Sequence, residues 1–475
     1  MQAIENFPIQ FFNTESRKKE VAALPRDRKI TMYTCGPTVY NFAHIGNFRA
    51  YIFEDLLRRT LKYFNYQVEQ VMNITDVDDK TINGANQNGV TLEAFIQPFE
   101  EAFFHDLQTL GIEKVEHYPK ATHYIPQMIT LIQTLLEKEV AYQGSDGSVY
   151  FAIDKFTRYG CLSHLNLDDL KSGASERVAN DEYDKENASD FVLWKGYDEK
   201  RDGPIYWDSP FGKGRPGWHL ECSTMAMEIL GPSIDIHCGG VDNIFPHHEN
   251  EIAQSEACTG KQFVKYWMHA EHLIVDGKKM SKSLGNFHTL RDLLSQGYTG
   301  REIRYMLLQT HYKTQLNFTI DELDAVKHSL NRLQDFIVRL KEVESQGDFG
   351  KAAGQIESCF ERFSKGIADD LNISVSLAAL FDLVREGNRL IDENQISQKE
   401  AEKVLDLLKT FNNILAVLQF EQEESLPENI QDLLDQRKNA RTNKEWKRSD
   451  ELRDQLQNLG YLVEDTPKGQ RVKAL

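Results

Sequence analysis

The stretch from Lys29 to Asn73 constrains the fold most, because it carries the pattern of a strand, a loop, a helix and a second strand. KITMYTCG and QVEQVMNIT are rich in β-forming residues, and RAYIFEDLLRRTLKYFNY between them has apolar residues at helical spacing. This order predicts a βαβ unit of an α/β sheet. The loop CGPTVYNFAHIGN ends where the helix begins, and the free N–H groups of a helix N-terminus bind anions. We therefore expect a phosphate site at this loop.

The remaining chain divides into segments of different pattern. A helical stretch, MITLIQTLLEKEV, precedes a long irregular region, after which SIDIHCGG and PHHENEIAQSEACTG predict a further strand and helix of the sheet. A long run of helical spacing follows, and then the acidic, Pro-containing FEQEESLPENI leads into a basic C-terminal stretch. We predict a split nucleotide-binding fold over 1–120 and 214–275, an insertion over 121–213, a loop region over 276–318, a helical bundle over 319–420, and a linker with a small basic module over 421–475.

Composition limits the class of protein. With 475 residues, 40% of them hydrophobic, the chain is long enough for several globular domains. It has no apolar run of membrane-spanning length and no signal-like N-terminus, so we expect a soluble cytoplasmic protein without membrane contact. The net charge of −18 opposes nucleic-acid binding unless basic residues gather locally. The six cysteines are scattered without a CxxC pair, so a metal site would have to join distant segments.

Two short strings connect this fold to a family. HIGN at His44–Asn47 and KMSKS at Lys279–Ser283 resemble the paired signatures of class I aminoacyl-tRNA synthetases. NITDVDDK, GRPGWHLECS, HCGGVDNIFPHHENEIAQS and RSDELRDQL extend the likeness to the cysteinyl-tRNA synthetase family, from about Phe7 to nearly the C-terminus. The resemblance implies a Rossmann-like catalytic domain with a connective insertion, a KMSKS and stem-contact region over 276–318, a helical bundle, and a C-terminal anticodon-binding module.

The family signatures imply an ATP site. Attack of a carboxylate on the α-phosphate of ATP puts negative charge on pyrophosphate, and mobile ammonium groups stabilise that charge. A lysine-rich turn taken alone is usually a solvated surface turn, and His44 alone could be no more than a neighbour of a helix cap. The resemblance makes His44, Lys279 and Lys282 catalytic. It assigns ATP binding to His44, Gly46, Asn47, His237, Gly239, Lys279, Ser281 and Lys282.

The resemblance also implies one zinc ion, bound by Cys35, Cys222, His247 and Glu251. His247 and Glu251 are four residues apart on a predicted helix, hence on one face and about 6 Å apart along its axis. Such a pair is more often a surface contact, and a lone cysteine is more often a small buried hydrophobe. His248 is a second possible ligand by residue type, but its own partner four residues on is the apolar Ile252.

Zinc has a physical reason to be present. Cysteine and serine are near-isosteres that shape alone separates by about 1–3 kcal/mol, whereas translation needs a factor of about 10⁴–10⁵. Zn²⁺ has a preference for soft sulfur, and a thiol ionises far more readily than an alcohol. The resemblance places the cysteine substrate against Gly36, Thr75, Trp218 and Asp242. Trp218 taken alone could equally be a core tryptophan.

The basic C-terminal stretch offers contacts to RNA phosphates and bases. We assign tRNA binding to Arg437, Arg441, Lys444, Trp446, Lys447 and Arg448. Trp446 could stack on a base or simply anchor the module. Two positions depart from the family pattern: Glu271 stands near the ATP site where glycine is common, and Val472 stands where many relatives have tryptophan.

Together these features predict ligation of L-cysteine to tRNA(Cys) with ATP and Mg²⁺, and the resemblance implies a monomer. One alternative is a cysteine:amino-sugar ligase of the same superfamily, which should lack the basic C-terminal module. Another is a catalytically idle, zinc-containing tRNA-binding protein. The signature residues His44, Lys279, Ser281 and Lys282 argue against an idle protein.

Overall fold

The computed structural model describes residues 7–165, 190–281, 284–347, 349–420, 428–466 and 469–474. The chain forms two compact units, Met1–Leu418 and Gln419–Leu475. In the described part of the chain, no helix combines the length and the apolar character needed to cross a membrane.

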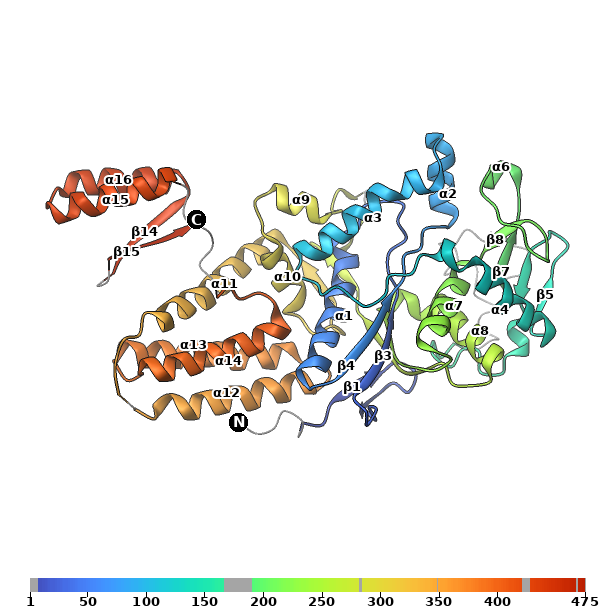
Figure 1. Cartoon of the computed structure of the whole chain (residues 1–475), viewed down its shortest axis with the longest axis horizontal. Coiled ribbons are helices and arrows are strands. Elements are labelled where there is room, and N and C mark those ends of the chain that lie inside the picture. The colour runs from blue at the N-terminus through green and yellow to red at the C-terminus, as the bar shows by residue number, and fades with distance from the viewer. Residues whose placement is uncertain are drawn as a thin grey trace. The chain divides into compact units, whose positions relative to one another are not determined.

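A four-stranded parallel sheet forms the centre of the first unit (Figure 1). Its strand order is β10 (Val264–Ala270), β9 (Ile234–Gly240), β3 (Lys29–Thr34) and β4 (Gln67–Met72). Tyr33 of β3 pairs with Val71 of β4 on one side and with His237 of β9 on the other. The α/β fold class expected from the sequence is confirmed. Because all four strands are parallel, their carboxyl ends meet at one edge, where ligands of α/β proteins bind.

The helices between these strands cover the sheet. α1 (Ile45–Tyr63) connects β3 to β4, and α8 (Glu249–Thr259) connects β9 to β10. α1 begins with a capping box, in which the His44 ring accepts the N–H of Asn47 and the Asn47 side chain accepts the N–H of His44. The HIGN string therefore forms the start of this helix. α7 (Trp218–Leu230) packs against α8 and α4 (Ile125–Glu137).

Smaller elements surround this sheet. In the predicted insertion over 121–213, β5 (Ala141–Gln143), β6 (Val149–Phe151) and β7 (Phe191–Gly196) form an antiparallel sheet, to which β8 (Gly214–Pro216) adds a strand from just beyond that boundary. A third sheet has the order β12 (Lys278–Lys279), β11 (Leu273–Val275), β13 (Leu316–Phe318). The other elements of this part of the chain are β1 (Gln10–Asn13), β2 (Lys18–Val21), α2 (Asp79–Asn88), α3 (Leu92–Thr109), η2 (Ala121–Tyr124), η3 (Ile153–Lys155), α6 (Glu199–Asp202), η4 (Val241–Asn243), η5 (Ile244–His248), α9 (Leu290–Ser295) and α10 (Gly300–Leu308).

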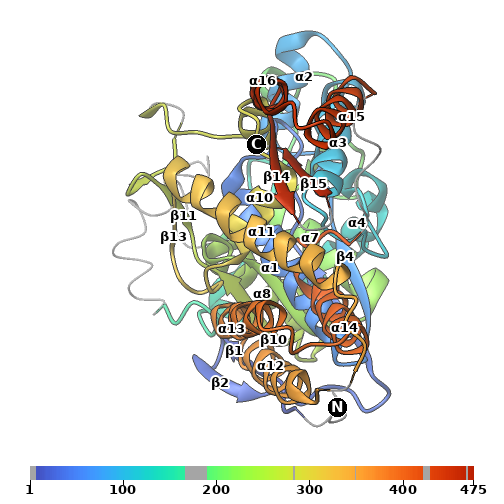
Figure 2. The same ribbon diagram turned by 90° about the vertical axis from the view of Figure 1, so that its left-hand side faces the viewer.

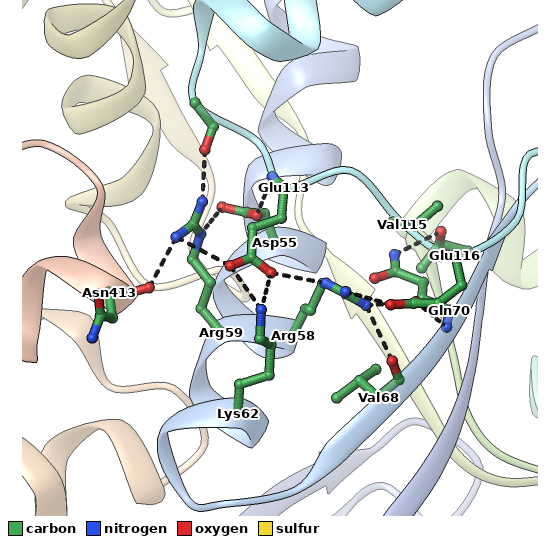
Figure 3. A network of polar contacts seen from close by, with 12 residues as sticks. Asp55, Arg58, Arg59, Lys62, Val68, Gln70, Glu113, Val115, Glu116 and Asn413 are labelled. Atoms are coloured by element: carbon green, nitrogen blue, oxygen red, sulfur yellow. Dashed lines mark hydrogen bonds and ion pairs between the residues drawn. The ribbon is translucent and has the colours of Figure 1, made fainter.

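Four helices follow in a bundle: α11 (Ile320–Lys341), α12 (Lys351–Ala368), α13 (Ile373–Asp392) and α14 (Gln398–Leu415) (Figure 2). A polar network joins this bundle to α1 (Figure 3). Arg59 donates to the carbonyl oxygen of Asn413 at 2.9 Å and pairs with Asp55 at 2.7 Å. Arg304 of α10 pairs with the same carboxylate and donates to the carbonyl oxygen of Leu415 at 2.7 Å. Asp55 thus holds the two arginines that join α1 and α10 to the bundle.

The second unit is built from α15 (Glu428–Thr442), α16 (Trp446–Asn458) and a hairpin of β14 (Tyr461–Thr466) and β15 (Gly469–Ala474). Ile430, Leu434, Leu456 and Val463 form its small core. Val472, which pairs with Val463, packs against this core. The departure from the family pattern at Val472 therefore contributes to packing within the unit.

Candidate active site and metal centre

Four side chains from distant parts of the chain converge beside the carboxyl end of β3. Cys35 directly follows this strand, Cys222 lies on α7, His247 lies in the turn before α8, and Glu251 lies in its first turn. One ligand atom from each of the four falls within 4.8 Å of the others. Cys222, His247 and Glu251 are buried, and Cys35 is half-buried. The structure therefore brings together the four residues that the family resemblance grouped as zinc ligands.

Outer contacts fix the orientation of His247 and Glu251. Nδ1 of His247 lies 2.8 Å from Nδ1 of His219, and Oε2 of Glu251 lies 3.1 Å from Nε2 of His237. The remaining atoms, Nε2 of His247 and Oε1 of Glu251, lie 3.0 Å apart. Among the described residues, neither atom has a hydrogen-bond partner of good geometry. Buried polar atoms left over in this way fit a metal ion, whose ligands are held by such outer contacts.

The charges of this group also fit a cation. Burial raises the pKa of Cys222, but a hydrogen bond from Cys35 and the nearby His247 outweigh burial and lower it overall. Burial raises the pKa of Glu251, but His237 and His247 outweigh burial and hold it below its ordinary value. Burial lowers the pKa of His247, but Cys222 and Glu251 outweigh burial and raise it to about 10, so the group as a whole attracts positive charge. Thiolate, imidazole and carboxylate are all ligands of Zn²⁺.

His248, the alternative ligand, belongs to an overlapping group. Cys35, His237, His248 and Glu251 also offer ligand atoms within 4.8 Å of one another. Nε2 of His248 lies 3.4 Å from Sγ of Cys35, while its Nδ1 lies 2.8 Å from Nε2 of His269. Both groups include Cys35 and Glu251, and only the first includes the second thiol, Cys222.

The structure shows where each of the four residues predicted to surround the cysteine substrate lies. A Cβ atom on Gly36 would come within 1.7 Å of the carbonyl oxygen of Asn73, so only glycine fits there. The ring of Trp218 stacks on that of His247, with centroids 4.1 Å apart, and forms an apolar wall of the metal group. Thr75 is buried and accepts a hydrogen bond from Asn73. Asp242 is exposed in the turn that follows β9.

The HIGN and KMSKS segments meet in the folded chain. A Cβ atom on Gly46 would lie 3.2 Å from Cε of Met280, inside the KMSKS string. The N–H of Ile45 donates to the carbonyl oxygen of His288 at 3.0 Å, which joins the start of α1 to the segment after KMSKS. Lys279 is exposed on β12, and the N–H of Ser281 donates to Oδ1 of Asn286 at 2.9 Å. Lys282 lies outside the described residues.

His237 was predicted to contact ATP. Its side chain is fully buried, and its Nε2 lies 3.1 Å from Oε2 of Glu251. His237 thus contacts one residue of the four-residue group, and its role toward adenosine stays a prediction. Gly239, two residues on, is buried and pairs in register with His269. Glu271 accepts the N–H of His272 with its side chain at 3.0 Å.

Sequence reasoning missed two histidines of this centre, His219 and His269. His219 stands three residues before Cys222 on the same helix, and this spacing is a signal that could have found it. His269 lies at the end of β10, and its Nδ1 lies 2.7 Å from Oγ1 of Thr14. A histidine at the carboxyl end of a parallel strand is the corresponding signal there.

In the C-terminal unit, the predicted tRNA-binding residues separate into two kinds. Arg437 is 1% exposed and pairs with Asp465 at 2.9 Å, so it stabilises the unit and we remove it from the tRNA-binding set. Arg441 also pairs with Asp465, and its guanidinium lies 5.7 Å from the ring centroid of Trp446. The exposed members of the set are Lys444, Trp446, Lys447 and Arg448.

Family models match three parts of the chain. The model for "tRNA synthetases class I (C) catalytic domain" matches residues 22–328. The DALR domain matches 362–419, and the cysteinyl-tRNA ligase anticodon binding domain matches 423–472. Among solved structures, Mycobacterium tuberculosis methionyl-tRNA synthetase in complex with methionyl-adenylate shares the fold at a TM-score of 0.61 and 15% identity, over 81% of this chain and 89% of that one.

The fold and the paired signatures define a class I aminoacyl-tRNA synthetase. Cysteine–tRNA ligase of Protochlamydia amoebophila is 60% identical over 472 residues, 99% of both chains, and that of Chlamydia pneumoniae is 56% identical over 469 residues, 98% of both. The chain belongs to the cysteine–tRNA ligase family.

Proposed function

We propose that this enzyme activates L-cysteine with ATP to cysteinyl-adenylate and transfers the cysteinyl group to the terminal adenosine of tRNA(Cys). The observation that carries the proposal is the convergence of Cys35, Cys222, His247 and Glu251 next to the HIGN loop. Cys35 and His44 flank one loop, so a substrate sulfur at the cysteines and a phosphate at the start of α1 fit the two ends of one small molecule.

In the activation step, His44 and Lys279 stabilise charge on the phosphates. The positive end of the α1 dipole attracts the nucleotide, and Lys279 reaches the leaving pyrophosphate when its loop closes. The close approach of Gly46 to Met280 supports a shared role of the two signatures. The KMSKS motif assigns Lys282 to the same stabilisation of negative charge on the phosphates. Mg²⁺ accompanies ATP.

Selection of cysteine over serine is assigned to the metal group. When bound there, Zn²⁺ supplies a preference for soft sulfur over oxygen that a pocket of fixed shape lacks. His219 and His237 hold His247 and Glu251 in the orientation that such binding needs. The ring of Trp218, stacked on that of His247, gives the group an apolar side.

In the transfer step, a ribose hydroxyl of the terminal adenosine attacks the activated carbonyl. We assign no protein side chain as general base, because the phosphate of the adenylate itself can accept the proton. At the other end of the tRNA, the exposed cations around Trp446 bind phosphates and the ring stacks on a base. Arg441 lies against that ring and supports its position.

Aminoacylation tests this proposal directly. Purified enzyme, ATP, Mg²⁺ and radiolabelled cysteine should charge a tRNA(Cys) transcript, and the label should be lost when the terminal ribose is oxidised beforehand. A protein that binds the transcript with no charging under these conditions would instead be the idle tRNA-binding protein.

A further inference from the structure

The loop between β3 and α1 exposes two aromatic rings. Tyr40 and Phe42 are each 39% exposed, although large apolar side chains are normally buried. The backbone beneath them is fixed, because the N–H of Val39 donates to the carbonyl oxygen of Thr75 and the N–H of Thr75 donates to that of Pro37. The two rings are therefore presented at set positions.

Each ring lies next to a cation from another element. Nζ of Lys80, on α2, is 5.0 Å from the ring centroid of Tyr40. The guanidinium of Arg291, on α9, is 4.6 Å from the ring centroid of Phe42. Arg291 is held in place by Asp106 of α3, whose Oδ2 accepts its Nη1–H at 2.9 Å. Lys80 of α2 and Arg291 of α9 thus place positive charge beside this exposed loop, and Asp106 of α3 holds Arg291 in position.

We propose that Tyr40 and Phe42 form a stacking platform for the unpaired nucleotides at the 3′ end of tRNA, with Lys80 and Arg291 contacting their phosphates. Aromatic rings paired with cations are the means by which proteins bind single-stranded nucleic acid, since every base has a face to stack and every linkage has a charge. Each ring has a cation beside it and is 39% exposed, which leaves part of the ring for a base, and the ring of Phe99 contacts that of Phe42 edge-on.

The place of the rings in the chain selects this occupant. Phe42 precedes His44 by two residues, a reach of about 7 Å at most, and Tyr40 follows Cys35 by five residues, a reach of about 18 Å. This inference rests on the proposed function, in which the adenylate forms beside the HIGN loop. The platform therefore lies at the edge of that site. The terminal ribose of the tRNA must reach that site, and this ribose is carried by the unpaired 3′ end of the molecule.

The test uses Tyr40→Ala and Phe42→Ala in the full-length enzyme, with Tyr40→Phe and Phe42→Tyr as variants that keep a ring. Phe349→Ala is the matched control, since Phe349 is a phenylalanine of 40% exposure in the segment before α12. Each variant is measured in cysteine-dependent ATP–pyrophosphate exchange and in aminoacylation. Each is also titrated with intact tRNA(Cys) and with the same transcript lacking its unpaired 3′ nucleotides.

We expect each alanine variant to lose about fivefold or more in kcat/KM for tRNA, with exchange unchanged. The loss of affinity should appear with the intact transcript and vanish with the shortened one, and the ring-keeping variants and Phe349→Ala should match the wild type. A raised KM for ATP would place the rings in the nucleotide site and overturn the inference. An equal loss with both transcripts, or no loss in aminoacylation, would also overturn it. Failure of the proposed function differs from these results, because the wild type would then show no cysteine-dependent exchange.

Discussion

Nε2 of His247 lies 3.0 Å from Oε1 of Glu251, one helical turn further along the chain, and both side chains are almost fully buried. A further histidine contacts the second polar atom of each side chain: His219 contacts Nδ1 of His247, and His237 contacts Oε2 of Glu251. Such contacts satisfy the remaining polar atoms of a buried pair, and at a metal centre they also set the direction of each ligand atom.

Replacement of a thiol ligand should remove the metal and weaken recognition of cysteine. For Cys222→Ser we expect a loss of bound zinc after dialysis against a chelator, and a rise of at least about 10-fold in KM for cysteine with KM for ATP nearly unchanged. Cys359→Ser is the matched control, because Cys359 is also buried but lies on α12 of the bundle. Full zinc occupancy and an unchanged preference for cysteine over serine in Cys222→Ser would contradict the assignment of Cys222 as a zinc ligand.

The outer histidine His219 should matter to metal affinity although it is outside the proposed ligand set. His219→Ala leaves Nδ1 of His247 without its neighbour, and we expect zinc affinity to fall about 10–100-fold in a competition with a coloured chelator. The far-ultraviolet circular dichroism should stay that of the wild type. An unchanged zinc affinity would show that the 2.8 Å contact between the two rings has no part in binding.

Lys279 should act in the transition state of activation. Loss of one charge stabiliser typically costs about 10²–10³ in kcat, so Lys279→Ala should slow ATP–pyrophosphate exchange by that factor with little change in KM for cysteine. Its exposed neighbour Lys278, on the same short strand, provides the control Lys278→Ala. Equal losses in the two variants would point to general surface charge as the cause.

Asp55 should stabilise the contact between α1 and the bundle, and its contribution to the free energy of unfolding should depend on pH. Burial raises the pKa of this carboxyl, but Arg304 and Arg59 outweigh burial and hold it below its ordinary value. Its contribution is therefore present above the unfolded pKa of about 4 and is lost as the pH falls through the lower folded pKa. Asp55→Asn leaves Arg304, which is 0% exposed, without its counter-charge and should cost about 3–5 kcal/mol at pH 7.

Urea unfolding of Asp55→Asn followed from pH 7 to pH 3 checks this expectation, and the difference from the wild type should narrow below about pH 4. Asp382→Asn breaks an exposed pair with Arg362 and should cost no more than about 1 kcal/mol. A penalty for Asp55→Asn that stays constant with pH would exclude the charge as its source.

The sequence predicted the parallel sheet and the helical bundle well, because both rest on periodic apolar patterns such as those of α1 and α11. The zinc group came from family motifs alone, since nothing in the spacing of Cys35, Cys222 and His247 shows that the fold brings them together. A strand-end histidine such as His237 suits either a nucleotide or a metal site, and the sequence pattern does not show its contact with Glu251. Arg437 was misassigned because a basic helix pattern does not show which of its arginines is buried against Asp465.

We propose that this enzyme selects cysteine by its sulfur at the adenylation step. ATP–pyrophosphate exchange measured with each of the twenty amino acids tests it most directly. Cysteine should stimulate exchange strongly, and serine should fall below it by a factor of about 10⁴ or more in kcat/KM. Stimulation by serine or methionine as strong as that by cysteine would contradict the account.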